Sequence, residues 1–228
     1  MNFHEYESRA DAALAAGKRI INALHRRLEK EERAAVVLTG GSTPGPVYSY
    51  MAHKQLDWHR VHVLLSDERW VAADHPDSNE KMLRTALDRS RASYANIQQY
   101  YDAAGSLEDR CAQLDSEFAA LPLPFTSTLL GMGDDGHIAS LFPDAANLAA
   151  SLDLQAESAY AAVDTASSPH RRLSMTLSAL LKSDEVLLLI SGAQKRDVLE
   201  RAAAGELEFP VAHLLQQSRT PVDVYWAP

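Results

Sequence analysis

Four short apolar runs, each followed by a polar or glycine-rich cluster, place the strongest constraint on how this chain folds. They read A-A-V-V-L-T (34–39), V-H-V-L-L-S (61–66), T-S-T-L-L-G-M (126–132) and V-L-L-L-I-S (186–191). Runs that are apolar throughout are typical of strands buried on both faces, as in a parallel sheet that helices cover. A weaker strand pattern lies at 158–163, and a last strand is expected at 221–226.

Between these runs lie segments whose apolar residues recur at helical spacing. Helices are expected at 5–30, 44–51, 78–87, 106–120 and 193–202. Strands that alternate with helices predict an α/β fold, with a parallel sheet at its centre and helices on both faces. The 228 residues contain no internal repeat, low-complexity segment or clear linker, so residues 1–228 are expected to form a single domain.

Charge and cysteine content narrow the possible partners and the compartment. The chain has 22 lysines and arginines against 31 aspartates and glutamates, a net charge of −9, which disfavours nucleic acid and anionic membranes as partners. No apolar run approaches the ~18 residues of a membrane span, and the first residues are acidic where a signal peptide is basic. The single cysteine, Cys111, excludes an internal disulfide, so we expect a cytoplasmic protein in which Cys111 packs as a small hydrophobic residue.

The four polar clusters all follow predicted strands. They lie at 39–44, 66–70, 131–137 and 191–195. Because parallel sheets bind ligands at the carboxyl ends of their strands, we expect these clusters to build one shared site. If that site binds an anion, its positive field must be local, since the chain as a whole is acidic.

The first cluster, T-G-G-S-T-P, has the composition of a phosphate-binding turn. Gly40 and Gly41 allow the backbone to approach a ligand closely. Ser42 and Thr43 add hydroxyl donors, and the next helix would present its N-terminal N–H groups. No G-K-[ST] sequence follows, so a Walker-type triphosphate site is not expected. The alternative is an ordinary strand-to-helix turn.

The second and third clusters carry titratable groups. Asp67, Glu68 and Arg69 are candidates for substrate binding or acid–base steps, and the alternative is a solvated loop with internal ion pairs. In G-M-G-D-D-G-H, His137 is the candidate general base, and Asp135 is placed to orient it. No second histidine or cysteine stands at metal-ligand spacing, so no metal site is expected, and the other histidines are expected at the surface or satisfied in the core.

Two later segments offer further cations. Arg171 and Arg172 follow a proline in S-P-H-R-R-L-S-M-T, and Lys195 falls in the first turn of the helix after the strand at 186–191. Isolated charges of this kind are usually solvated, so their interest comes from the clusters that they would join.

The segments T-G-G-S-T-P, D-E-R-W, G-M-G-D-D-G-H-I-A-S-L-F-P, R-L-S-M-T and G-A-Q-K occur in this order along the chain. Together they resemble the motifs of the 6-phosphogluconolactonases, which share a superfamily with glucosamine-6-phosphate deaminase. The resemblance runs from about Arg33 to Pro228. It implies a modified Rossmann-like fold of the deaminase type. It also implies hydrolysis of 6-phosphoglucono-δ-lactone to 6-phosphogluconate, in the oxidative pentose phosphate pathway, without a metal or organic cofactor.

The same resemblance implies which residues hold the substrate's phosphate. The glycine-rich turn would bind the 6-phosphate through Gly40, Gly41, Ser42 and Thr43. Arg172, rather than Arg171, and Lys195 would add positive charge at the phosphate or the sugar.

At the reacting end, the resemblance implies that His137 is the base and that Asp135 supports it. His137 would take a proton from the water that attacks the lactone carbonyl, and Arg69 or backbone N–H groups would stabilise the oxyanion. Asp67 and Glu68 would lie against the substrate beside Arg69, and Asp67, Glu68 or Asp135 remain alternatives for a share in the base's task. No G-x-S-x-G sequence occurs, so a covalent acyl-enzyme is not expected.

Two rival functions fit the motifs less well. The deaminase branch usually continues after D-G-H-I-A with an Asn-Glu-Pro sequence that carries an acid, whereas this chain reads S-L-F-P at 140–143. A sugar-phosphate sensor would not need His137, and no spare basic segment is present for binding DNA.

Asp134 departs from the family, which usually has an uncharged residue there. The oligomeric state stays open, with a monomer as the working expectation.

Overall fold

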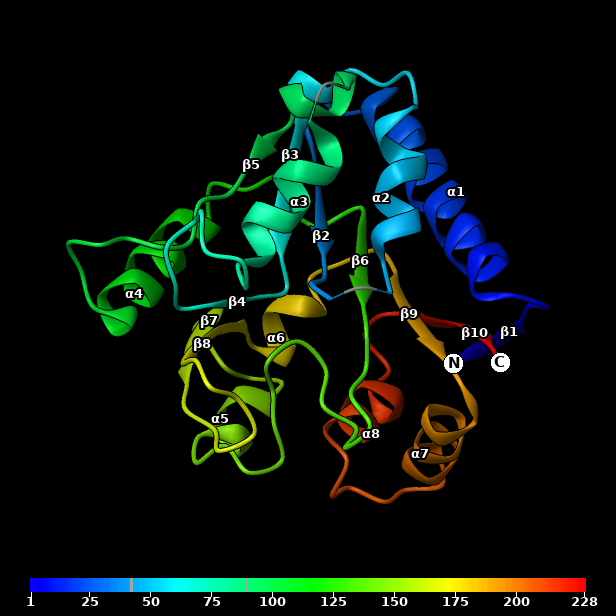
Figure 1. The fold of residues 1–228 in the computed structure, drawn as a ribbon, viewed down its shortest axis with the longest axis vertical. Helices are drawn as coiled ribbons and strands as arrows, with labels where there is room; N and C mark the ends of the chain where they lie inside the picture. The colour runs from blue at the N-terminus through cyan, green and yellow to red at the C-terminus, as the bar shows by residue number, and fades with distance from the viewer. Residues whose placement is uncertain (42, 89) are drawn as a thin grey trace.

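The computed structural model describes residues 1–41, 43–88 and 90–228, and in them the chain forms two sheets surrounded by helices (Figure 1). The strands are β1 (Asn2–Glu5), β2 (Ala34–Leu38), β3 (Val61–Leu65), β4 (Asp67–Arg69), β5 (Asn96–Ile97), β6 (Ser127–Leu130), β7 (Tyr160–Val163), β8 (Arg172–Met175), β9 (Val186–Ser191) and β10 (Val222–Ala227). The α-helices are α1 (Arg9–Leu28), α2 (Gly45–Ala52), α3 (Asn79–Leu87), α4 (Leu107–Phe118), α5 (Leu148–Leu152), α6 (Leu177–Leu180), α7 (Ala193–Ala203) and α8 (Pro210–Gln216). Two short 3-10 helices cover Trp58–Arg60 and Arg91–Tyr94.

The larger sheet has seven strands in the order β1-β10-β9-β6-β2-β3-β5, and every pair in it is parallel. Helices α1, α2 and α3 group on one side of the central strands, while α7 and α8 pack together on the other (Figure 1). The α/β fold with a covered parallel sheet is therefore confirmed. The four apolar runs of the sequence form β2, β3, β6 and β9, all in the interior of the sheet.

The connections reverse direction at the middle of this sheet. From β2 the chain passes to β3 on one side, whereas β6, the neighbour on the other side, is reached only later. The register between β2 and β6 consists of Val36–Ser127 and Val37–Thr128, so it stops before either strand ends. A crevice at such a switch point is where open parallel sheets bind ligands.

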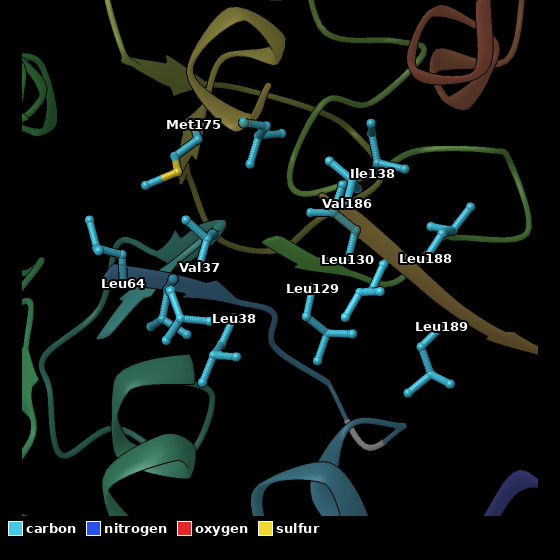
Figure 2. Close-up of a cluster of buried hydrophobic side chains, with 14 of the residues drawn as sticks. Val37, Leu38, Leu64, Leu129, Leu130, Ile138, Met175, Val186, Leu188 and Leu189 are labelled. Carbon is cyan, nitrogen blue, oxygen red and sulfur yellow. The ribbon is translucent and has the colours of Figure 1, made fainter. Parts of the chain in front are cut away.

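The central strands are buried on both faces, and their side chains form the main core (Figure 2). Val37, Leu129 and Leu188, from three neighbouring strands, are each fully buried. Removal of this apolar surface from water is the main stabilising contribution to a fold of this kind. The continuous apolar pattern of the runs is thus explained by helices on one face of the sheet and helices on the other.

The first helix begins later than the pattern predicted. The expected helix at 5–30 starts at Arg9, because Ser8 caps it and accepts a hydrogen bond from the Asp11 N–H at 3.1 Å. Residues before the cap form β1, which pairs with β10 at the edge of the sheet. The side chains of β1 are exposed, so the segment carries no apolar alternation by which a strand is recognised.

The smaller sheet was not expected. Its order is β4-β8-β7, and both of its pairs are antiparallel. The strand expected at 158–163 exists as β7, but it lies in this sheet and not in the parallel one, which corrects the sequence analysis. The polar segments D-E-R and R-L-S-M, for which no strand was predicted, are β4 and β8. Strands of three or four residues that carry charges have no signal in an apolar pattern.

Cys111 is buried in α4, and this burial raises the pKa of its thiol to about 12. Among the described residues, no helix combines the length and the apolar character that a membrane span needs.

Substitution of Leu188 by alanine tests how much the central strands contribute. Leu188 is 0% exposed, so Leu188→Ala should lower the free energy of unfolding by about 2–5 kcal/mol, measured by urea denaturation. Leu207, which is 53% exposed, is the control, and Leu207→Ala should change stability by no more than about 0.5 kcal/mol. Equal losses in the two variants would contradict this description of the core.

Candidate active site

A cleft of about 400 Å³ opens at the carboxyl edge of the parallel sheet. All four predicted clusters contribute to it, with Gly40, Arg69, His137 and Lys195 among the residues that line it. These residues follow β2, lie in β4, and follow β6 and β9, respectively. The expectation of one shared site at this edge therefore agrees with the geometry.

The glycine-rich turn after β2 forms one wall of the cleft. A Cβ atom on Gly40 would lie 2.1 Å from the side-chain oxygen of Asn79, so only glycine fits there. Gly41 has a φ of +90°, which side chains other than glycine rarely adopt. Thr43 lines the cleft beside them. Ser42, the fourth member of the expected phosphate cradle, lies outside the described residues.

Two helices begin at this wall. Helix α2 follows Pro44, and α7 follows Gly192; neither helix has a side-chain hydrogen bond at its N-cap. Pro44 and Lys195, the latter in the first turn of α7, both line the cleft. Uncapped helix N-termini present free N–H groups and a partial positive charge, so this end of the cleft suits an anion.

The loop after β6 holds His137 against Asp135. The distance from His137 Nδ1 to Asp135 Oδ1 is 2.6 Å, and the His137 backbone N–H also donates to this oxygen at 3.2 Å. A Cβ on Gly133 would lie 2.2 Å from His137 Nδ1, and Gly136 has a φ of +77°. The glycines of this motif thus allow the loop to turn tightly around the imidazole.

This contact defines which imidazole nitrogen can accept a proton. Burial alone would raise the pKa of Asp135. The hydrogen bond and the charge of His137 lower it by more, so the net pKa lies below the ordinary value. An ionised carboxylate accepts hydrogen bonds only, so Nδ1 of His137 carries the proton. Nε2 of His137 has no hydrogen-bond partner among the described residues and is the nitrogen available to a ligand.

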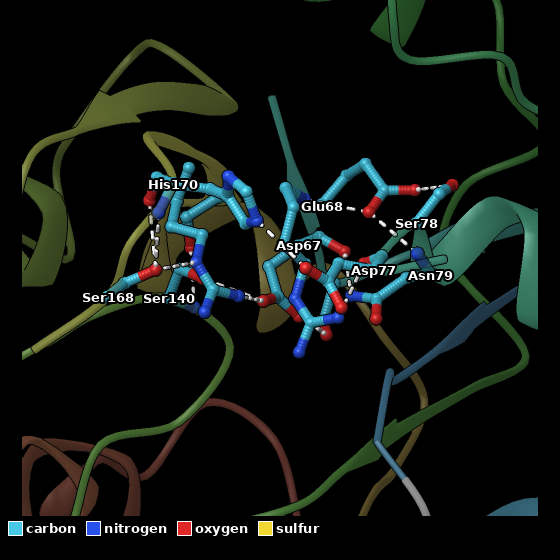
Figure 3. Close-up of polar contacts among 12 residues, drawn as sticks. Asp67, Glu68, Asp77, Ser78, Asn79, Ser140, Ser168 and His170 are labelled. Atoms are coloured by element: carbon cyan, nitrogen blue, oxygen red, sulfur yellow. Dashed lines mark hydrogen bonds and ion pairs between the residues drawn. The ribbon is translucent and has the colours of Figure 1, made fainter. Parts of the chain in front are cut away.

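Asp67 lies at the centre of a buried polar network (Figure 3). Ser140 Oγ donates to Asp67 Oδ2 at 2.6 Å, and Ser66 Oγ donates to Oδ1 at 3.0 Å. Arg172 Nη1 lies 3.8 Å from the same Oδ2, and both residues line the cleft. Two hydroxyls donate to this carboxylate, and the Arg172 guanidinium lies beside it. These contacts support a role for Asp67 in positioning Arg172.

Two arginines face each other across the small sheet. The register of β4 and β8 places Arg69 directly opposite Arg172. Like charges at opposite positions destabilise a pair of strands. The pKa of Arg172 is lowered, mainly by burial; the charge of Asp67 raises it, and the charge of Arg69 lowers it. Nε of Arg69 is buried and has no partner among the described residues, while its Nη1 donates to the carbonyl of Asp77 at 2.6 Å. A bound anion in the cleft would relieve the repulsion between the two arginines.

Glu68 lies elsewhere than expected. It is 2% exposed, it does not line the cleft, and its carboxylate accepts four hydrogen bonds around the start of α3 (Figure 3). The donors are the backbone N–H groups of Arg69, Asn79 and Glu80 and the hydroxyl of Ser78. Burial raises the pKa of Glu68, and these four bonds oppose the rise. Its place supports a structural role, in contrast to the substrate contact that the sequence suggested.

Asn79 and Phe142 are among the residues that line the cleft without having been predicted as site residues. Asn79 packs against Gly40, and its side-chain amide donates to the Asp67 carbonyl at 3.0 Å. Phe142 has its ring 4.2 Å from that of His137 and 5.7 Å from the Arg172 guanidinium. Asn79 lies at the start of the helix expected at 78–87, and Phe142 belongs to the S-L-F-P segment. The places of these two residues in the helix and in the motif were the signals available in the sequence.

Arg171 and Asp134 lie away from the cleft lining. Arg171 pairs at the surface with Asp164 and Glu108, at 2.7 and 2.6 Å, whereas Arg172 beside it lines the cleft. Asp134 is exposed.

Comparisons with known proteins agree with this geometry. A profile of the family described as glucosamine-6-phosphate isomerases/6-phosphogluconolactonase matches residues 7–226, so the chain belongs to this family. A 6-phosphogluconolactonase from Pseudomonas putida is 37% identical over 227 residues, covering 99% of this chain and 92% of that protein. The crystal structure of a 6-phosphogluconolactonase from Shewanella baltica has a TM-score of 0.94 at 31% identity, covering 100% of this chain and 98% of that one. A monomeric glucosamine-6-phosphate deaminase, at 20% identity and a TM-score of 0.74 over 98% of this chain and 97% of that one, shares the fold.

Replacing Glu68 with glutamine tests its structural role. The NH₂ group of the new amide would face N–H or O–H donors whose hydrogen bonds the carboxylate now accepts. Glu68→Gln should therefore lower the free energy of unfolding by about 1–3 kcal/mol, because those donors lose their acceptor. Glu29→Gln, at an exposed residue at the end of α1, is the matched control and should be close to neutral. Urea denaturation measures both, and a neutral Glu68→Gln would contradict the assigned role.

Proposed function

We propose that this protein hydrolyses 6-phospho-D-glucono-1,5-lactone to 6-phospho-D-gluconate, the second step of the oxidative pentose phosphate pathway. The observation that carries the proposal is the His137–Asp135 pair at one wall of the cleft. The glycine-rich turn before α2, Lys195 and Arg172 form the other walls. Relatives that match nearly the whole chain are named 6-phosphogluconolactonases, which supports the same substrate. In this proposal the enzyme acts in the cytoplasm as a monomer, without a metal or organic cofactor.

The phosphate of the substrate would bind at the glycine turn. Gly40, Gly41 and Thr43 offer backbone and hydroxyl donors there, and Ser42 belongs to the same turn in the sequence. Lys195 and Arg172 add positive charge from two other elements. The phosphate takes no part in the reaction, so its binding energy serves to orient the lactone carbonyl.

At the reacting end, His137 would act as general base. Its Nε2 takes a proton from a water molecule while the water oxygen attacks the carbonyl carbon of the lactone. The carbonyl oxygen becomes an oxyanion, which the positive charge of Arg69 at the cleft wall stabilises. The tetrahedral intermediate then collapses, the ring C–O bond breaks, and the imidazolium returns its proton to the departing ring oxygen. Asp135 holds the ring and stabilises its charged form throughout.

The positions and contacts of Asp67 and Glu68 favour His137 as the general base over these two carboxylates. Glu68 lies outside the cleft lining, and the oxygens of Asp67 are occupied by hydroxyls and lie near Arg172. A lactone is an activated ester, so direct attack by water needs no covalent intermediate. Ser140, the serine that follows the histidine motif, is buried and bonded to Asp67, which argues against a nucleophilic role for it.

The His137→Ala variant tests the reaction and the base together. The lactone would be generated in the assay, and proton release above the spontaneous rate would be followed. The wild type should accelerate hydrolysis, and His137→Ala should lose about 100-fold or more in kcat, because general base catalysis typically contributes that much. Asp135→Asn should lose less than His137→Ala, since the imidazole stays in place but is less well oriented.

His25→Ala, at an exposed histidine of α1, is the control and should retain wild-type rates. Full activity in His137→Ala would move the base to another group. Absence of acceleration by the wild type would refute the lactonase proposal and turn attention to glucosamine 6-phosphate.

The neighbouring arginines provide a matched pair for substrate binding. Arg172→Ala should raise KM by roughly tenfold or more, because a charge-assisted contact to an anion is lost. Arg171→Ala should leave KM within about threefold, because exposed ion pairs contribute little and Arg171 does not line the cleft. Steady-state kinetics on the lactone distinguish the two, and equal effects would remove Arg172 from the proposed phosphate end.

A further inference from the structure

Two loops at the rim of the cleft bring together residues that are far apart in the sequence. His75 and Asp77 lie between β4 and α3, and His170 lies just before β8. His170 Nε2 is 2.9 Å from Asp77 Oδ2, and His75 Nδ1 is 3.9 Å from the same oxygen. The three atoms all lie within 4.8 Å of one another, and they form the one such trio of potential metal ligands among the described residues. Figure 3 shows His170 directed toward Asp77.

We propose that His75, Asp77 and His170 form a binding site for a divalent transition-metal ion of the Zn²⁺ type. Two imidazole nitrogens and one carboxylate oxygen are ligands that suit Zn²⁺, whereas Mg²⁺ and Ca²⁺ prefer sets made of oxygen alone. Ligand atoms around a tetrahedral Zn²⁺ lie roughly 3.3 Å apart, given metal–ligand bonds of about 2.0–2.1 Å. The observed 2.9 and 3.9 Å lie on either side of this value, so side-chain rotations suffice to close the site.

The backbone of both loops is already fixed by its own hydrogen bonds. The His75 N–H donates to the Ala72 carbonyl at 2.9 Å, and the His75 carbonyl accepts from the Ser78 N–H at 3.1 Å. The His170 carbonyl accepts from the Ser168 hydroxyl at 2.9 Å. The rings of the two histidines are in contact, with centroids 5.4 Å apart. A metal would therefore bind side chains whose main chains need little further ordering.

Binding exchanges two existing contacts for metal bonds. The hydrogen bond between His170 Nε2 and Asp77 Oδ2 must open, because both atoms would become ligands. The Asp77 N–H donates to His75 Nδ1 at 3.1 Å, and this bond must open to free the nitrogen.

The site is linked to both arginines of the cleft. Arg69 Nη1 donates to the Asp77 carbonyl, and Arg172 Nε donates to Ser168 Oγ at 2.8 Å. Ser168 in turn holds His170. A metal that joins the two loops would thus restrain the positions of two substrate-facing side chains. Binding itself does not depend on the proposed lactonase activity.

Titration with metal ions on the purified full chain, treated first with a chelator, tests the site. Zn²⁺ binding would be followed by calorimetry, and Co²⁺ by the visible absorption that marks a four-coordinate site. We expect one equivalent to bind to the wild type, with a rise in melting temperature of roughly 5 °C or more at a hundredfold excess over Kd. His75→Ala and His170→Ala should each weaken binding by roughly tenfold or more.

His25→Ala is the control and should bind like the wild type. His170→Gln gives a second test if His170→Ala does not fold, because it keeps a polar side chain of similar length but removes the imidazole. The proposal is overturned if the wild type shows no saturable binding. It is equally overturned if folded variants at His75 and His170 keep the wild-type affinity, since the metal would then bind elsewhere on the surface.

Discussion

Strands β2 and β6 lie side by side at the centre of the parallel sheet, and the chain leaves them in different directions. This divergence leaves room at their carboxyl ends that side chains of neighbouring strands do not fill. The loops that follow, with Gly40 on one side and Gly133 on the other, line the cleft. The catalytic proposal, the anion-binding wall and the helix N-termini all depend on this one reversal in the order of strands, since it decides which loops meet.

The small antiparallel sheet supplies what the parallel sheet cannot. A parallel sheet offers loops and helix ends, whereas β4 and β8 hold Arg69 and Arg172 at fixed, opposing positions. Two like charges in register cost stability, and Asp67, itself held by Ser140, offsets the repulsion at Arg172. Two guanidinium groups held in this way at the wall of the cleft are what is expected of an anion-binding site prepared in advance.

The sequence predicted the parts of the fold that depend on continuous apolar patterns. The central strands were found because burial on both faces makes them largely apolar, and the longer helices were found because their apolar residues recur at helical spacing. The small sheet was missed because its short strands carry charges, and β1 was missed because its side chains are exposed. Glu68 was placed in the cleft because sequence adjacency to Arg69 does not reveal that alternate residues of a strand face opposite ways. His75 and His170 were interpreted as ordinary histidines because no spacing rule relates residues of two separate loops.

The place of β10 has a consequence for synthesis on the ribosome. This strand lies between β1 and β9, so the first strand of the sheet pairs with the last one to be made. Until β10 emerges, β1 has no strand to join, and the apolar β9 presents an open edge along most of its length. The nascent chain therefore carries β1 unpaired through nearly all of its elongation and an open apolar edge on β9 from the synthesis of that strand until β10 is made. Protection of the β9 edge by a chaperone in this last stage would matter more for this protein than for one whose sheet closes strand by strand.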